Sequence, residues 1–143
     1  MVLADLQQVF STSEWPEFLA LNTKENCLTL HIRVSPDTYW LTGHFPEQPV
    51  LAGVVQTHWA AELGQYAFAL AEGFQGIDNL KFHSVILPGQ ELNLTLQYFP
   101  ETRSIRFSYQ SVAMPSLDTF PSGVLSSDVS DTHVLYSEGK LVF

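Results

Sequence analysis

Two histidines, one carboxylate and one glycine have the types and spacing that acid–base chemistry needs. His44 lies in a turn, and Gly53, His58 and Glu62 follow in a stretch without proline. Imidazole has an unperturbed pKa of ~6.5, so a histidine can take or give a proton near neutral pH. His58 and Glu62 are four residues apart, so a helix would place them on one face, where the carboxylate can orient the imidazole. This pattern indicates general acid–base catalysis.

Gly53 is expected at the start of the same helix. Helix N-termini present free N–H groups and the positive end of a dipole, which stabilise an oxygen that gains negative charge. A structural interpretation remains open at each position. His44 can cap backbone groups in its turn, Gly53 can serve only a tight bend, and His58 can be a hydrogen-bonded core residue.

The elements that must position these residues are a rigid turn and one helix. Residues 41–53 contain two prolines and two glycines, which leave a turn few conformations. Residues 54–70 have no proline and are rich in Ala, Leu, Glu and Gln, which predicts a helix that Gly73 and Gly76 close. The helix is apolar nearly all round, so we expect it to be buried, with His58, Glu62 and Gln65 on one stripe.

The rest of the chain reads mainly as strands. Residues 1–19 suffice for one short amphipathic turn or helix, and the end of the chain predicts a hairpin or a bulged strand around Glu138-Gly139. Alternating or continuous apolar residues joined by short loops predict antiparallel strands at 28–34, 77–87, 92–98 and 105–110. One buried helix covered by an antiparallel sheet is an α+β fold.

Residues 1–143 are expected to form a single domain. Residues 113–131 interrupt the strand pattern with two prolines, a glycine and many Ser and Asp residues. They predict a long, mobile loop. Such loops inside compact domains are either functional or disordered, and the sequence leaves both interpretations open.

Composition excludes several classes of protein. The chain has 15 Asp and Glu against 6 Lys and Arg, a net charge of −9, which disfavours nucleic acid or an anionic membrane as a partner. It shows no apolar run that could span a bilayer and no signal peptide, so we expect a cytoplasmic protein. Cys27 is the only cysteine. No spacing of His, Cys and Asp predicts a metal site, and no cofactor-binding glycine motif is present.

Two blocks of the sequence resemble the beta-hydroxyacyl-acyl-carrier-protein dehydratases. Gly-His-Phe-Pro at positions 43–46 and Pro-Val-Leu-Ala-Gly-Val-Val at 49–55 resemble the active-site segment that precedes the family's helix. Residues 80–92 resemble the strand pair that follows the helix. The resemblance extends over residues 27–110 and 134–143, and His58 within the helix makes the chain look most like the aryl polyene branch.

The resemblance implies a hot-dog fold, in which an antiparallel sheet wraps around one long central helix. It implies a homodimer whose active sites are built across the subunit interface. The implied reaction is cofactor-free dehydration of a 3-hydroxyacyl thioester on acyl carrier protein to the trans-2-enoyl thioester, in fatty acid or aryl polyene type synthesis. An acidic carrier would need a basic docking patch, for which the candidates are Lys81, Arg103 and Arg106.

The resemblance also assigns roles to individual residues. His44 matches the family's base. His58 stands where most members carry the Glu or Asp that protonates the departing hydroxyl, and Glu62 would support it. The predicted substrate-binding residues are Gly53, Phe45 and Val54.

The chain departs from the family pattern at three positions, which keeps two other functions open. Glu47 replaces a glycine, Ala52 replaces a proline, and His58 replaces the carboxylic acid. These substitutions are compatible with a non-catalytic hot-dog subunit that binds acyl chains or pairs with an active paralogue. A hot-dog thioesterase is the other alternative, in which Glu62 would activate water.

Overall fold

The structure is a computed structural model that describes residues 1–37, 50–112 and 134–143. Two helices and six strands lie in these ranges. In chain order they are α1 (Leu3–Val9), β1 (Glu17–Lys24), β2 (Cys27–Arg33), α2 (Gly53–Ala67), β3 (Gly76–Phe82), β4 (Glu91–Phe99), β5 (Ser104–Ser111) and β6 (Leu135–Val142).

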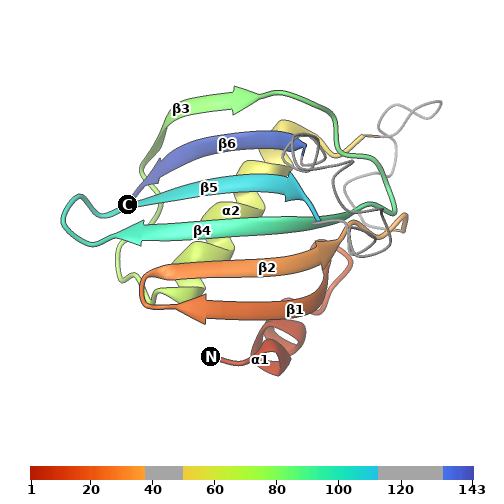
Figure 1. The fold of residues 1–143 in the computed structure, drawn as a ribbon. Coiled ribbons are helices and arrows are strands. Elements are labelled where there is room, and N and C mark those ends of the chain that lie inside the picture. Colours follow the sequence, from red (N-terminus) through yellow and green to blue (C-terminus); the bar gives the residue numbers. More distant parts are fainter. Residues whose placement is uncertain (38–49, 113–133) are drawn as a thin grey trace, which may run out of the picture.

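The strands form one antiparallel sheet in the order β1-β2-β4-β5-β6-β3. Helix α2 lies across one face of this sheet, and α1 lies beside β1 at one end (Figure 1). The other end of the sheet is the edge strand β3. This arrangement confirms the predicted α+β class with antiparallel strands and matches a hot-dog-like fold.

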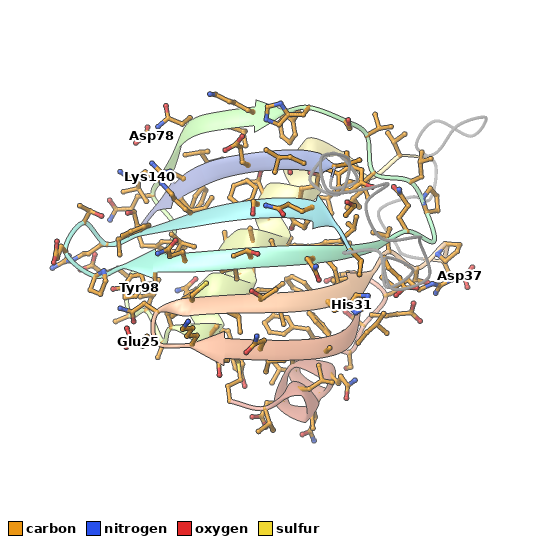
Figure 2. All side chains as sticks on the ribbon, in the orientation of Figure 1. Glu25, His31, Asp37, Asp78, Tyr98 and Lys140 are labelled. Atoms are coloured by element: carbon orange, nitrogen blue, oxygen red, sulfur yellow. The ribbon has the colours of Figure 1, made fainter. Side chains whose placement is uncertain are left out.

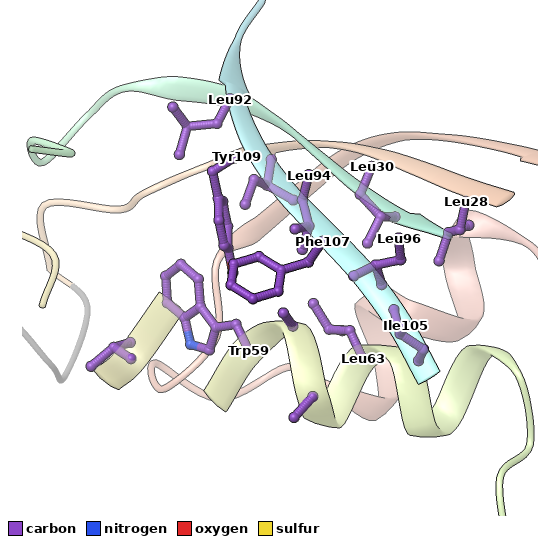
Figure 3. Close-up of a cluster of buried hydrophobic side chains, with 14 of the residues drawn as sticks. Leu28, Leu30, Trp59, Leu63, Leu92, Leu94, Leu96, Ile105, Phe107 and Tyr109 are labelled. Carbon is purple, nitrogen blue, oxygen red and sulfur yellow. The ribbon is translucent and has the colours of Figure 1, made fainter. Parts of the chain in front are cut away.

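The period-two alternation of the strands separates a core face from an outer face. Figure 3 shows leucines of β2 and β4 and aromatic residues of β5 packed against Trp59 and Leu63 of α2. The alternate side chains, such as His31 and Lys140, lie on the outer face (Figure 2). The leucines and isoleucines of β2 and β4 are almost fully buried, so the alternation read from the sequence is confirmed in these strands.

Two strands differ from the expectation, and the last strand decides between two alternatives. Residues 17–24 form β1, although only a turn or short helix was expected within residues 1–19. Strand β3 ends at Phe82 rather than at Leu87, because the N–H groups of His83 and Ser84 both donate to the carbonyl of Tyr136 and the ladder with β6 does not continue in register. Residues 135–142 form one continuous strand whose pairing with β5 and β3 shifts register, which supports the bulged-strand alternative and excludes the hairpin.

Gly139 lies inside the last strand, where its missing side chain leaves room for an aromatic ring. A Cβ atom at this position would lie 2.8 Å from Cε2 of Phe107 on the neighbouring strand. The glycine therefore serves close packing of an aromatic ring across the ladder, not a turn.

Helix α2 is shorter and more exposed than expected. It ends at Ala67, and Ala69 then adopts a positive φ of 51°, so neither Gly73 nor Gly76 ends it. Val55, Trp59 and Leu63 are buried against the sheet as predicted. The prediction of a helix buried all round is wrong, because an exposed stripe at four-residue spacing contains Val54, His58, Glu62 and Tyr66. No helix in the described part of the chain has the length and hydropathy to cross a bilayer.

A buried hydrogen-bond network fixes the N-terminal turn of α2 to the sheet. Tyr109 donates its hydroxyl to the carbonyl of Gln56 (2.6 Å), and Ser137 donates to Oε1 of Gln56 (2.6 Å). The side-chain amide of Gln56 donates to the carbonyl of Leu51 (3.0 Å). The backbone N–H of Leu51 donates to the carbonyl of Ile86 (2.8 Å). Because buried polar groups without partners are costly, this network defines where the helix begins.

Tyr109 makes the stability of the protein sensitive to high pH. Burial raises the pKa of its hydroxyl well above the usual value of 10.0. The folded protein therefore holds this proton at pH values where the unfolded chain has released it, so stability falls as pH rises above about 10, by up to about 1.4 kcal/mol per pH unit. Tyr109→Phe should reduce this alkaline loss. Urea unfolding of the wild-type and variant proteins between pH 8 and pH 11 measures the free energy of unfolding of each. Parallel curves of this free energy against pH would contradict the prediction.

Candidate active site

An apolar groove lies between the exposed stripe of α2 and the edge strand β3. Its volume is about 430 Å³. It begins at the first residue of the helix and runs along the helix for somewhat more than two turns. The lining residues are Gly53, Val54, Thr57, His58, Ala61, Glu62, Phe74, Ile77, Leu80 and Phe82.

His58 and Glu62 both come from α2 and both line this groove. Their four-residue spacing places them on one face, as the sequence predicted. Both residues are exposed in the isolated chain, so the alternative interpretation of His58 as a core histidine is wrong. An imidazole and a carboxylate along an otherwise apolar groove are suited to transferring protons to a ligand bound there.

Gly53 is the first residue of α2, where the groove begins. The backbone N–H groups of Val55 and Gln56 donate the first hydrogen bonds of the helix, to the carbonyl of Ala52 at 3.1 Å each. The N–H groups of Gly53 and Val54 therefore lie before the first hydrogen bond of the helix. Gly53 has no positive φ, and a tight bend therefore does not require a glycine here. The missing side chain instead admits the ring of Phe82 from β3, whose Cε1 and Cε2 atoms would lie 2.8 and 2.9 Å from a Cβ atom.

Gly53→Ala should therefore have two separable effects. Overlap with the Phe82 ring should lower stability by roughly 1 kcal/mol, because the exposed end of that ring can move only in part. If a substrate also approaches the backbone at Gly53, catalytic activity should fall as well. In the double variant with Phe82→Ala the overlap is gone, so the added Cβ should cost no further stability while the loss of activity remains. Melting temperature and turnover measure the two effects, and recovery of activity in the double variant would assign the glycine to packing alone.

Several predicted residues fall outside the described ranges. His44, Phe45, Glu47 and the loop 113–131 belong to residues 38–49 and 113–133, so their predicted roles stay predictions. The groove itself contains the predicted residues Gly53, Val54, His58 and Glu62. In the described part of the chain, no group of three or more His, Cys, Asp or Glu side chains is placed as metal ligands would be.

The three candidate residues for a basic patch do not all come together. Lys81 and Arg106 line one hollow of about 470 Å³, which Lys140 also lines. This hollow lies on the outer face of the sheet, opposite α2. Arg103 instead pairs with Glu72 at 2.8 Å. The basic residues therefore do not border the groove as a single patch.

Three features of the site were missed by the sequence analysis. Gln56 anchors the start of the helix, Phe82 covers Gly53, and Trp15 stacks on His58. A buried glutamine within an apolar helix is a usable signal, because it requires partners. The two aromatic contacts join segments far apart in the sequence, so no local spacing predicts them.

Comparison with protein families decides what kind of domain this is. The model of the family described as ApeI-like, ApeI dehydratase, matches residues 20–118, which is more than half of the chain. The chain belongs to the ApeI-like dehydratase family. The match includes the predicted active-site turn, the groove and the strands β2, β3, β4 and β5.

Relatives of this ApeI-like chain include enzymes of known name. It is 35% identical over 71 residues to the 3-hydroxyacyl-[acyl-carrier-protein] dehydratase FabZ of Clostridium botulinum (strain Okra / Type B1), covering 45% of this chain and 49% of that enzyme. The enzyme of the same name from Clostridium novyi (strain NT) is also 35% identical over 71 residues, covering 45% of this chain and 50% of the enzyme. The chain thus spans about half the length of the curated relatives it matches.

Two solved structures share its fold over most of their length. An uncharacterized protein from Erwinia carotovora subsp. atroseptica aligns with a TM-score of 0.70 at 29% identity, over 90% of this chain and 94% of that one. The dehydratase heterocomplex ApeI:P from Xenorhabdus doucetiae aligns with a TM-score of 0.69 at 24% identity, over 90% of this chain and 96% of the matched one.

Proposed function

We propose that this ApeI-like chain dehydrates a 3-hydroxyacyl thioester carried by acyl carrier protein to the trans-2-enoyl thioester. The observation that carries the proposal is the placement of His58 and Glu62 in an apolar groove that begins at the N-terminus of α2. Membership of the dehydratase family and the Gly-His-Phe-Pro sequence at 43–46 support it. The substrate belongs to fatty acid or aryl polyene type synthesis.

The proposed reaction moves one proton at each of two histidines. Neutral His44 takes the proton from C2, next to the thioester carbonyl, and the N–H groups at Gly53 and Val54 stabilise the negative charge that develops on the carbonyl oxygen. The C3–O bond then breaks, and protonated His58 gives its proton to the departing hydroxyl, which leaves as water. Exchange of protons with solvent restores both rings. Glu62 orients His58, Phe45 contacts the substrate, and the acyl chain lies along the apolar wall formed by Phe74, Ile77 and Leu80.

The proposed assembly is a cytoplasmic homodimer of single hot-dog domains, in which the sheet wraps around α2 and each site contains groups from two copies. The support lies in β3, an edge strand whose residues are exposed along nearly its whole length. Its inner side and the residues around it form a β3 patch of exposed apolar side chains: Val54, Phe74, Ile77, Leu80, Phe82, Val85 and Leu87. Monomeric proteins rarely expose an open edge strand beside an apolar patch of this kind.

Leu80→Glu tests this assembly. Leu80 is 38% exposed in the isolated chain, and a second copy packed on the β3 patch would bury the new carboxylate without a partner. We expect the wild-type protein to be a dimer at micromolar concentration and Leu80→Glu to be a monomer with much reduced activity. Light scattering measures both masses.

Val9→Glu is the matched control for this experiment. Val9 is an apolar residue of α1 with 53% exposure, at the opposite end of the sheet from β3. It should therefore leave the dimer intact. A wild-type monomer that retains activity, or a dimer that survives Leu80→Glu, would refute the proposed interface.

The reaction itself is tested with one substrate and three possible products. A 3-hydroxyacyl thioester on acyl carrier protein is incubated with the pure protein, and enoyl thioester, free acid and unreacted substrate are quantified. Enoyl thioester is the expected product. Free acid would instead indicate a thioesterase in which Glu62 activates water.

A second arm addresses the non-catalytic alternative. The solved structure from Xenorhabdus doucetiae is described as a dehydratase heterocomplex. An inactive protein that gains activity when mixed with a second dehydratase subunit would therefore support a role as a pairing subunit and refute the homodimeric enzyme.

A further inference from the structure

We propose that Trp15 is the positioning residue that holds the His58 imidazole in its orientation toward the groove. The two rings are stacked, with centroids 5.3 Å apart and planes 23° from parallel. Both values lie within the range of favourable offset stacking. This inference rests on the proposed role of His58 as the acid.

Trp15 lies on the side of His58 away from the proposed substrate. His58 lines the groove, whereas Trp15 lines a separate hollow of about 440 Å³ formed by α1, the segment after it and the start of β1. The imidazole therefore lies between the indole and the groove. Trp15 does not line the groove, so its effect on the reaction has to pass through His58.

The segment that contains Trp15 is fixed to the helix at adjacent positions. Trp59, which is fully buried in α2, donates its indole N–H to the carbonyl of Glu14 at 2.8 Å. Glu14 thus contacts Trp59, and the next residue, Trp15, contacts His58. The hydrogen bond therefore helps to set the position of the stacked pair. The N–H of Trp15 also donates to the carbonyl of Thr12 (3.2 Å).

Phe10 also contacts the indole of Trp15. Its ring meets Trp15 edge-on, with centroids 4.6 Å apart and an angle of 70°. Phe10 also meets Tyr66 of α2 edge-on at 5.4 Å, which ties α1 to the helix that carries His58. The stacked indole restricts the rotamers that the imidazole can adopt, and a misplaced proton donor is expected to slow the reaction rather than weaken binding.

The test is a set of single and double variants assayed for dehydration of the 3-hydroxyacyl thioester. Trp15→Leu removes the stacking face and should lower kcat roughly 10- to 100-fold with KM unchanged. Trp15→Phe keeps an aromatic face and should retain most of kcat. In a His58→Glu background Trp15→Leu should have little further effect, because no imidazole remains to be oriented.

Tyr98→Leu is the matched control. Tyr98 stacks on Phe68 with nearly the same geometry, 5.2 Å and 26°, but neither ring lines the groove. This variant should leave kcat unchanged. The imidazole protons of His58 provide a second measurement, since the indole ring should shift their NMR signals upfield relative to those of His31, and Trp15→Leu should remove that shift.

Each outcome has one meaning. An unchanged kcat in Trp15→Leu, an equal loss of kcat in the His58→Glu background, or an unshifted His58 signal would overturn the positioning role while leaving the proposed reaction intact. A wild-type protein that forms no enoyl thioester would overturn the proposed function and this inference with it. If Trp15→Leu does not fold, an unshifted His58 signal in the wild-type protein would still overturn the positioning role.

Discussion

His44→Ala is expected to lower the rate of dehydration by roughly 10²–10⁴, the usual contribution of a general acid or base. His44 precedes the first residue of α2 by nine positions, in the segment for which the sequence predicts a turn. Without its imidazole, no side chain named in the proposed site takes the C2 proton, whereas binding of the acyl chain along the groove is unaffected. The loss should therefore appear in kcat and much less in KM. Steady-state kinetics with the carrier-bound substrate measure both constants.

His31→Ala is the control for this prediction. His31 lies on the outer face of β2 and pairs with Glu91 at 2.8 Å, away from the groove. Its replacement should leave kcat unchanged. Melting temperatures of both variants establish that they are folded. A folded His44→Ala protein with full activity would end the dehydratase proposal, and would favour the interpretation of His44 as a residue that caps backbone groups.

The second large effect is expected at His58, where two substitutions should differ. His58→Ala removes the proton donor and should lower kcat by roughly 10²–10⁴ as well. His58→Glu introduces the carboxylic acid that most of the wider family carries at this position, and should keep measurable activity. Because His58 is exposed on α2 in the isolated chain, neither change buries a charge within the fold of one copy, and both should alter the stability of that fold by less than roughly 1 kcal/mol.

The pH dependence of the reaction provides a further check on the two histidines. A base that must be neutral and an acid that must be protonated predict a bell-shaped profile of rate against pH. With a carboxylic acid at position 58, the limb that reports the acid should move to lower pH, since an unperturbed Glu has a pKa of ~4.3. Equal activity of His58→Ala and the wild-type protein would show that another group protonates the hydroxyl.

Much of the sheet could be predicted because its strands have a clear period of two. The apolar residues of β2, β4 and β5 alternate without interruption, and burial follows the alternation. Strand β1 was missed because Phe18 is its only buried residue, so no alternation marks it. Its pairing with β2 is a tertiary effect that the local sequence does not show.

The exposed face of α2 was missed for a related reason. Val54 is apolar but 77% exposed in the isolated chain, so an apolar residue there did not mean a buried one. It faces the groove between α2 and β3. A helix can therefore look apolar all round when one of its faces serves a ligand or a second chain rather than the core of its own domain.

The candidate site was predictable to the extent that its residues are close in sequence. His58 and Glu62 are four residues apart on one helix, so their spacing predicts a shared face, and Gly53 lies at the start of the same helix, where the groove begins. Trp15 contacts His58 from the end of the sheet where α1 lies, and Phe82 contacts Gly53 from the edge strand β3. Only the fold brings them there.

The central claim is that each site contains groups from two copies, and we propose that these groups are His44 of one copy and His58 of the other. It is tested by combining two inactive variants in one dimer. His44→Ala and His58→Ala chains are coexpressed with different tags, and the mixed dimer is purified through both. In a shared site, one of the two sites of the mixed dimer has both histidines, while the other has neither.

The measurement is the dehydration rate of the mixed dimer against those of the two parent variants. The account predicts about half of the wild-type rate per dimer, since one of two symmetric sites is intact. Each parent variant should remain roughly 10²–10⁴ below wild type. A folded mixed dimer that is as inactive as its parents would show that the two histidines do not meet across an interface, and would contradict the proposed site.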